Sequence, residues 1–238
     1  MRILVCLLVV LAALYAQPKR PVEEFSTKLG VVKITPIRHA SLMIEAGGKV
    51  IYVDPAQGSY EGLPQADLIL ITHGHGDHLS EMIIAGLKKP GAQILGPAVV
   101  VKALPEAALI RSGEARDFGQ WKIEVIPAYN MERKRPDGSP YHPQGEGVGY
   151  VLSCGGKRFY IAGDTEGIPE MKELKNIEAA FLPMNLPYTM TPEQAAEAVR
   201  AFKPKIVYPY HYRGADLKLF EKALAGSGVE VRLRDWYY

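Results

Sequence analysis

Short runs of apolar and β-branched residues alternate with helix-like patterns along most of the chain. The run 66–71 is mostly apolar and predicts a buried strand, because both faces of such a strand need apolar side chains. Similar runs, separated by turn residues, predict strands at 31–36, 41–46, 49–53, 93–95, 114–118, 121–127, 149–153, 157–162, 179–182, 206–209 and 229–233. Periodic segments predict helices at 79–87, 98–108, 191–202 and 215–225. The succession of strands and helices runs twice without a detectable sequence repeat, which indicates one α/β domain.

Local signals mark several element ends. The pair Gly47-Gly48 lies between two predicted strands and is typical of a hairpin turn. Thr191 precedes Pro192 and is followed three residues on by Gln194, which is the pattern of a capping box at a helix start. The segment 128–147 is different, because it is rich in proline, glycine, tyrosine and charge and has no periodicity. Loops of this length are usually functional or disordered, so this one is a candidate source of site residues.

The N-terminal end of the chain differs from the rest. Residues 1–16 contain one charge, Arg2, followed by an apolar stretch up to Ala16, and this predicts a secretory signal peptide cleaved after Ala16. A bilayer span needs about 20 apolar residues, so we expect no stable membrane span; the alternative is an uncleaved anchor. Residues 17–28 are polar and contain proline, which predicts a tether, and 29–238 form the predicted domain. We therefore expect an exported protein, either periplasmic or secreted.

Charge and cysteine content exclude some function classes. The formal net charge is +2, and removal of residues 1–16 lowers it by one, because Arg2 is the only charged residue removed. A nearly neutral domain has no electrostatic footprint for nucleic acid. Removal of the same residues leaves Cys154 as the only cysteine, so no intrachain disulfide can form. The hydrophobic content of 47% is sufficient for one sizeable core, which must supply the stability together with any bound metal.

Imidazole and carboxylate groups are concentrated directly after the predicted strand 66–71. Three of the six histidines, His73, His75 and His78, lie within six residues together with Asp77. Two glycines between them allow the backbone to turn tightly, so that neighbouring side chains can converge. Neutral imidazole and carboxylate are ligands that zinc accepts, and the carboxyl end of a strand is where α/β sheets place ligands. The stretch predicts a metal site; the alternative is a polar loop that happens to be rich in histidine.

The remaining three histidines and one aspartate are further candidates. Asp164 follows a predicted strand within Gly-Asp-Thr, and its alternative role is to cap the following turn. His211 follows another predicted strand within Tyr-His-Tyr. His142 is the only histidine of the long loop, and its alternative is an exposed residue without a ligand role. His39 lies between the first two predicted strands, where a lone histidine is more often structural than a ligand.

The order of these residues resembles a known family. The stretch His73 to His78 is similar to the His-x-His-x-Asp-His signature of the metallo-β-lactamase superfamily, here between a strand and a helix, and Asp164 matches the superfamily's bridging aspartate. The segment 38–41, Arg-His-Ala-Ser, is similar to the Gly-His-Ala-Ser element of the lactonase-like and phospholipase D-like branch, with Arg38 in place of the glycine. The resemblance covers nearly the whole mature chain and implies a four-layer αββα sandwich, within the α/β class.

The resemblance also implies how the ligands divide between two metals. Many superfamily members carry the third histidine in Pro-Gly-His directly after a strand, and here that place reads Pro-Ala-Tyr-Asn, ending at Asn130. We therefore give the vacant role to His142, while Asn130 stays open as a weak substitute or as a donor behind the ligands. We interpret His39 as a residue behind the ligands. The implied sets are His73, His75 and His142 for one metal, Asp77, His78 and His211 for the other, and Asp164 as the bridge.

The implied activity is hydrolysis at a dinuclear centre. Two adjacent cations lower the pKa of a bridging water, so that hydroxide exists at ordinary pH, and Asp77 is the natural group to orient it and pass on a proton. Histidine-rich ligation favours two Zn²⁺ ions, while Mn²⁺ or Fe²⁺ is also permitted. The branch implies a small-molecule ester, lactone or phosphodiester as the substrate, ahead of a β-lactam, because the Pro-Gly-His ligand is missing.

Two other function classes remain as alternatives. A single iron on this scaffold would oxidise a sulfur substrate, but the complete second ligand set argues against it. A binding module would keep the fold without turnover, but the intact ligands argue against that. Aromatic and polar residues near the predicted strand ends are candidates for a pocket rim: Tyr129, Asn130, Tyr141, Asn185, Tyr188, Tyr210, Tyr212 and Arg213.

Overall fold

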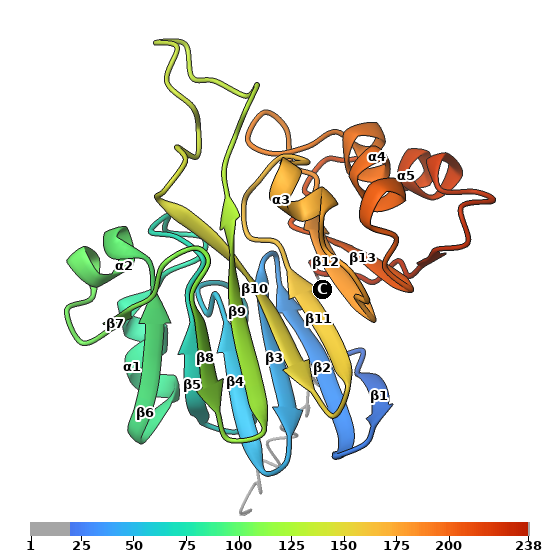
Figure 1. Ribbon diagram of the computed structural model, residues 1–238. Helices are drawn as coiled ribbons and strands as arrows, with labels where there is room; N and C mark the ends of the chain where they lie inside the picture. Colours follow the sequence, from blue (N-terminus) through green and yellow to red (C-terminus); the bar gives the residue numbers. More distant parts are fainter. Residues whose placement is uncertain (1–19, 238) are drawn as a thin grey trace, which may run out of the picture.

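Two seven-stranded sheets lie face to face in the computed structural model, which describes residues 20–237 (Figure 1). Each sheet takes its strands in chain order, so the two halves of the chain form one sheet each. The first sheet contains β1 (Glu23–Thr27), β2 (Gly30–Arg38), β3 (Ser41–Ala46), β4 (Lys49–Val53), β5 (Ala66–Leu70), β6 (Lys88–Gly96) and β7 (Ala108–Leu109). The second contains β8 (Ala115–Phe118), β9 (Trp121–Ala128), β10 (Gly147–Cys154), β11 (Lys157–Ile161), β12 (Ala179–Pro183), β13 (Ile206–Tyr210) and β14 (Glu230–Val231).

Helices cover the outer face of each sheet (Figure 1). One apolar cluster fills the space between the sheets, a second packs α1 and α2 against the first sheet, and a third packs α3 to α5 against the second. This arrangement confirms the expected four-layer αββα sandwich. The helices are α1 (Glu81–Leu87), α2 (Ala98–Ala103), α3 (Pro169–Lys172), α4 (Pro192–Phe202) and α5 (Leu217–Ala223).

Parallel strands carry the chain to one common edge of the sandwich. Strands β4 to β7 are mutually parallel in the first sheet, and β11 to β14 are mutually parallel in the second. The carboxyl ends of parallel neighbours lie at the same edge, where α/β sheets place their ligands. The segments that follow β4, β5, β11 and β13 are therefore the ones that the fold brings together.

The predicted local signals are present where the sequence placed them. Thr191 Oγ1 accepts a hydrogen bond from the backbone N–H of Gln194 at 3.1 Å, and Gln194 Oε1 accepts one from the backbone N–H of Thr191 at 3.0 Å, so the capping box of α4 is confirmed. Gly47 and Gly48 join β3 to β4 with φ values of +59° and +72°. Two left-handed residues in a row match the twist of a two-residue hairpin, and glycine adopts them without strain.

Strand β1 lies inside the segment that the sequence predicted as a tether. Its five residues pair with β2 in register from Glu23 with Ile34 to Thr27 with Gly30, so the tether prediction is wrong for them. Glu23 and Phe25 face inward and are buried. An acid on the inward face conceals the apolar alternation that would otherwise reveal a strand. The predicted signal peptide and the start of the tether lie outside the described residues.

The predicted helix 98–108 is also shorter than expected. Helix α2 ends at Ala103, and Ala108 and Leu109 instead form β7 beside β6. Pro105 explains the end, because its ring cannot continue the helical hydrogen bonds. Among residues 20–237, no helix combines the length and apolar character that a bilayer crossing requires.

Candidate metal centre

The segments after β5, β11 and β13 meet the loop that precedes β10. They bring together all seven side chains that the sequence singled out as metal ligands, and His39 joins them. In each of three groups, the ligand atoms lie within 4.8 Å of one another. The groups are His73, His75 and His142; His39, Asp77 and His211; and His73, His78 and Asp164.

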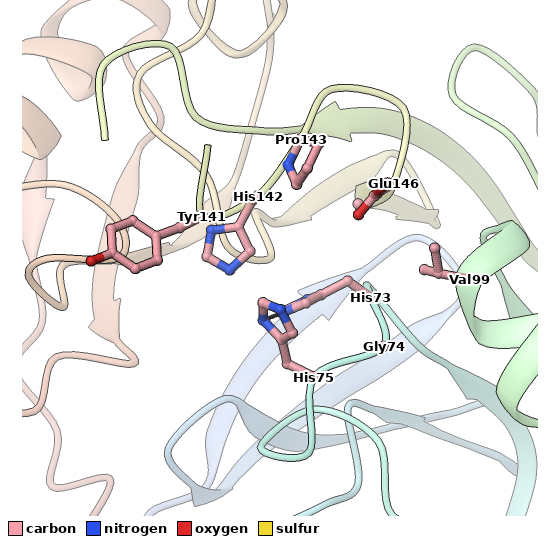
Figure 2. Close-up of a pocket in the computed structure, with 9 residues that line it drawn as sticks. His73, Gly74, His75, Val99, Tyr141, His142, Pro143 and Glu146 are labelled. Atoms are coloured by element: carbon pink, nitrogen blue, oxygen red, sulfur yellow. Dashed lines mark hydrogen bonds between the residues drawn. The ribbon is translucent and has the colours of Figure 1, made fainter. Parts of the chain in front are cut away.

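The first group is made of three imidazoles. Figure 2 shows the rings of His73 and His75, from the loop after β5, facing the ring of His142 from the long loop. His73 Nε2 lies 3.0 Å from His75 Nδ1, and His142 Nε2 lies 3.3 Å from Asp164 Oδ2. His73 and His142 are buried, whereas His75 is exposed. The group is therefore accessible from the side of His75.

A second set of donor atoms surrounds the other oxygen of Asp164. His78 Nε2 and His211 Nε2 each lie 3.4 Å from Asp164 Oδ1, and His211 Nε2 lies 3.5 Å from Asp77 Oδ2. Asp164 thus presents Oδ2 to His142 and Oδ1 to His78 and His211. One carboxylate between two sets of imidazoles is the arrangement that a bridging ligand requires.

Several of these buried atoms lack a partner that the protein itself supplies. Within residues 20–237, His78 Nε2, His211 Nε2 and Asp164 Oδ1 are inaccessible to solvent and make no hydrogen bond. Buried polar atoms are normally paired, and imidazole nitrogen and carboxylate oxygen are atoms to which a divalent cation binds. The donor set therefore fits a metal centre.

The charges of the cluster favour a cation between its carboxylates. Burial lowers the pKa of His78, but Asp164 and Asp54 outweigh this effect and raise it to about 9. Burial raises the pKa of Asp164, yet His211 and His78 hold it well below its ordinary value. Burial and the adjacent His78 lower the pKa of His73 well below 6.5. Asp164 is therefore a carboxylate and His73 a neutral imidazole, which are the states that metal ligands need. With a pKa of about 9, His78 would have to release its Nε2 proton when a cation binds.

Asp54, which directly follows β4, contacts His78 on the side away from the cluster. Its Oδ2 lies 2.7 Å from His78 Nδ1, and its two oxygens also accept hydrogen bonds from the backbone N–H and the hydroxyl of Thr72, each at 2.7 Å. Because Nδ1 donates its proton to this carboxylate, Nε2 is the ring nitrogen whose lone pair can bind a cation. Asp54 was not among the candidate residues that the sequence indicated. The available signal was a carboxylate at the carboxyl end of the strand that precedes the histidine-bearing one.

Backbone strain is concentrated at this edge. Among residues 20–237, five residues other than glycine have positive φ, and three of them are His39 (+57°), Asp54 (+48°) and His211 (+47°). Side chains with a Cβ rarely adopt this conformation, and it persists only where the surroundings enforce it. Its concentration at the donor cluster supports a functional site there.

Asn130 contacts His142 rather than the donor atoms of the cluster. Its Oδ1 accepts hydrogen bonds from the backbone N–H of His142 at 2.7 Å and from Nδ1 at 2.9 Å. Its amide nitrogen donates to the backbone oxygen of Tyr188 at 2.9 Å and to Glu166 Oε1 at 3.2 Å. Of the two residues that the sequence left open for the third position, the structure places His142 in the cluster and Asn130 behind it.

Glu166 fixes the start of the long loop. This carboxylate is buried, and it accepts hydrogen bonds from three consecutive backbone N–H groups, those of Met131 (3.0 Å), Glu132 (2.9 Å) and Arg133 (2.7 Å). Consecutive N–H groups that converge on one carboxylate form an anion-binding nest. Glu166 could not be singled out from the sequence, because its partners lie more than 30 residues away in the chain.

His39 is buried between Asp77 and the C-terminal segment. Its Nε2 lies 3.1 Å from Asp77 Oδ2, and its Nδ1 lies 2.8 Å from the hydroxyl of Tyr237. Burial raises the pKa of Asp77, but hydrogen bonds with His211 and His39 outweigh this and hold it well below its ordinary value. Asp77 is therefore ionised at neutral pH. His39 lies among the donor atoms of Asp77 and His211, so its role behind the ligands stays a prediction.

Comparison with known families agrees with this geometry. Residues 33–211 match a family model described as a Beta-lactamase superfamily domain. The chain belongs to the metallo-β-lactamase superfamily.

Relatives within the superfamily match this chain nearly end to end. A metal-dependent hydrolase of Pelotomaculum thermopropionicum is 33% identical over 221 residues, which cover 84% of this chain and 92% of the relative. A solved structure from Parabacteroides distasonis, named provisionally as a metal-dependent hydrolase, is 43% identical with a TM-score of 0.87 and covers 92% of this chain and 100% of its own. Igni18, a metallo hydrolase from Ignicoccus hospitalis, is 25% identical with a TM-score of 0.70 and covers 87% and 96%.

The donor cluster opens into a pocket of about 620 Å³. Asp77 and Asp164 lie in its wall, and a smaller cavity of about 200 Å³ adjoins the first imidazole group, with Val99, Pro143 and Glu146 in its lining (Figure 2). Four of the eight rim candidates line the larger pocket: Tyr141, Asn185, Tyr188 and Arg213.

The other four rim candidates have different surroundings. Tyr129 and Tyr210 are buried, and the hydroxyl of Tyr210 accepts a backbone hydrogen bond. Tyr212 donates its hydroxyl to a backbone carbonyl. Asn130 is directed at His142, as described above. None of these four side chains lines this pocket.

Proposed function

We propose that this metal-dependent hydrolase holds two cations and cleaves an ester, lactone or phosphodiester bond. The observation that carries the proposal is the position of Asp164, whose two oxygens face two separate sets of imidazoles. His73, His75 and His142 would hold one cation, and Asp77, His78 and His211 the other, with Asp164 between them. The unpaired, buried atoms His78 Nε2, His211 Nε2 and Asp164 Oδ1 support the second of these positions.

The residues of the site supply distinct parts of the reaction. When bound, a pair of cations lowers the pKa of water and polarises the bond under attack. Asp77 is 36% exposed at its side chain, and within residues 20–237 no hydrogen bond engages its Oδ1, so this oxygen can accept one from the attacking water. His39 fixes Oδ2 and thereby orients the carboxylate. Asp77 would take a proton from the attacking water at Oδ1 and then donate the same proton to the leaving group as negative charge develops there.

Zinc is the cation that we propose, because five of the six ligands other than the bridge are imidazoles, and zinc binds neutral imidazole nitrogen. Manganese or iron would also accept this mixture of imidazole and carboxylate. Metal analysis of protein purified without added metal distinguishes these ions.

The test combines metal content, turnover and one variant. Purified protein should contain about two metal equivalents per chain and hydrolyse members of an ester, lactone and phosphodiester panel. His75 is the exposed imidazole of the first group, so His75→Ala should remove metal and abolish turnover while the protein stays folded by circular dichroism. Full activity of this variant would contradict the ligand assignment. One iron per chain with oxygen uptake on a persulfide would favour the oxidoreductase, and a metal-loaded protein inactive on the whole panel would favour a binding module.

We also propose export to the periplasm or the medium. The support is the charge-free apolar stretch that ends at Ala16, within residues that the structure does not describe. Mass spectrometry of the exported protein should give a chain that starts at Gln17. An exported chain that still starts at Met1 would contradict cleavage.

A further inference from the structure

Two arginines line the pocket of the metal centre and form no ion pair within residues 20–237, although Arg135 acts at longer range on the exposed Asp137. Arg135 lies in the loop before β10 and Arg213 lies after β13, and both line the pocket of about 620 Å³. Within residues 20–237, neither guanidinium has a carboxylate within 4.0 Å, whereas Arg158, Arg232 and Arg234 each pair with a glutamate elsewhere. The two pocket arginines therefore keep their donors available for a ligand.

Aromatic rings hold both guanidinium groups in place. The Cζ atom of Arg135 lies 5.3 Å from the ring centroid of Tyr141, and its Nη2 donates to the backbone oxygen of Tyr141 at 3.2 Å. The Cζ atom of Arg213 lies 5.7 Å from the ring centroid of Tyr237. Contact with an aromatic face orients a guanidinium while leaving most of its N–H donors free.

The side chains that line the pocket, other than the proposed metal ligands, carry a net positive charge. Asp77 and Asp164 are the carboxylates of the described lining, and bound cations would offset both. The other polar side chains of the lining that lie away from the cluster, such as Gln57 and Asn185, are uncharged. Arginine matches the oxygens of carboxylate and phosphate groups with paired N–H donors, and a positive pocket attracts such anions.

We propose that the substrate carries a carboxylate or phosphate group separate from the bond that is hydrolysed, and that Arg135 and Arg213 bind this group. The inference rests on the proposed function, since it assigns the reacting bond to the metal centre and the anion to the arginines. A pocket of about 620 Å³ has the size of a site for a whole small molecule, so it has room for both parts.

Binding of matched acids to the metal-loaded protein tests the inference. Glutarate is butyrate with one additional carboxylate, and 4-phosphonobutyrate carries a phosphonate in place of that carboxylate. Calorimetry should show that at least one of these dianionic probes binds about tenfold more tightly than butyrate, which is the size of one charge-assisted hydrogen bond. Arg135→Gln and Arg213→Gln should each remove most of this advantage. Arg111→Gln, whose side chain lies outside this pocket, should retain it.

The measured ratio separates this inference from the proposed function. Equal binding of butyrate and both dianionic probes would overturn the inference, and so would arginine variants that weaken all three equally. Monophenyl glutarate and phenyl butyrate provide the hydrolysis test: equal kcat/KM for both esters supports the hydrolase and counts against the anion site. Tight glutarate binding that depends on the arginines, with neither ester cleaved, supports the anion site and counts against ester cleavage. The tighter of the two dianionic probes identifies the preferred anion.

Discussion

The side-chain oxygen of Asn130 accepts hydrogen bonds from two nitrogens of His142, the backbone N–H at 2.7 Å and the ring Nδ1 at 2.9 Å. The amide nitrogen of Asn130 meanwhile faces two acceptors, Glu166 Oε1 and the backbone oxygen of Tyr188. Because both ends of the amide have suitable partners, its orientation is fixed by the hydrogen-bond network. The proton of His142 therefore lies on Nδ1, and the Nε2 lone pair is directed toward Asp164.

Substitution of the two partners should have unequal effects on metal binding. His142→Ala removes a ligand, so we expect loss of about one metal equivalent per chain and of nearly all turnover. Asn130→Ala removes only the group that orients the ligand, so metal affinity should fall by about 10- to 100-fold. Competition with a coloured chelator measures both. A larger loss of metal from Asn130→Ala than from His142→Ala would show that the third ligand is assigned wrongly.

Glu166 should act on the same metal position from a greater distance. Glu166→Gln places an NH₂ group among the backbone N–H donors of residues 131–133, so the loop should shift and His142 with it. We expect a weaker first metal position and a changed ring-nitrogen signal for His142 in ¹⁵N NMR spectra. Glu170→Gln is the matched control, because Glu170 contacts Tyr129 and lies outside this network. Equal metal affinities for the two variants would contradict the role of Glu166.

Asp54 should control the second metal position through His78. In Asp54→Asn the carboxylate that holds His78 Nδ1–H is lost while the volume is unchanged, so metal affinity and kcat should fall by about 10- to 100-fold. Asp67→Asn is the control, since Asp67 also belongs to this part of the sheet but pairs with Lys89 at 2.8 Å. Titration of metal-free protein with zinc gives both affinities. An unchanged second affinity in Asp54→Asn would contradict this account.

Glu23 should make stability depend on pH. Burial raises the pKa of Glu23, but hydrogen bonds from Arg234, Tyr208 and Arg232 outweigh this and lower it below 4.5. A carboxylate with a lowered pKa in the folded state contributes stability above its unfolded pKa and loses that contribution as the pH falls through the folded value. Glu23→Gln should therefore unfold about 2 kcal/mol more easily at pH 7, with a smaller difference from wild type below pH 4.5.

Urea titrations at several pH values, on metal-free protein, measure this difference. Glu24→Gln is the neighbouring control, because Glu24 forms an exposed ion pair with Lys33 at 3.4 Å and such pairs contribute little. A constant difference between Glu23→Gln and wild type from pH 7 to pH 3 would contradict the role of the charge. A loss of stability in Glu23→Gln at pH 7 would also show that β1 contributes to the stability of the folded domain.

The fold could be predicted from the sequence where a local pattern determines the structure. Thr191 with Gln194 and the Gly47-Gly48 turn are such patterns, and the structure has both. Strand β1 could not be predicted, because Glu23 occupies an inward position and its partners Arg232 and Arg234 lie more than 200 residues away in the chain. Local periodicity carries no information about a partner at that distance.

In the candidate site, too, residues that are neighbours in the chain could be predicted, whereas residues that act through distant partners could not. The cluster His73 to His78 is recognisable because its members are neighbours in the chain. Asp54 and Glu166 were missed because they act by hydrogen bonds between separate segments, and an isolated acid at a strand end or in a turn has many possible roles. The choice between His142 and Asn130 stayed open for the same reason, since it depends on which way a long loop folds back.

The three groups of donor atoms each combine residues from both halves of the chain. His73 and His75 follow a strand of the first sheet, whereas His142 precedes a strand of the second; Asp77 and His211 are divided in the same way. A bound ion would therefore cross-link the two sheets, and chelation should loosen the protein first along the seam between them. Fragments that correspond to the two halves would each carry an incomplete site, so recovery of metal binding on mixing would report their reassembly.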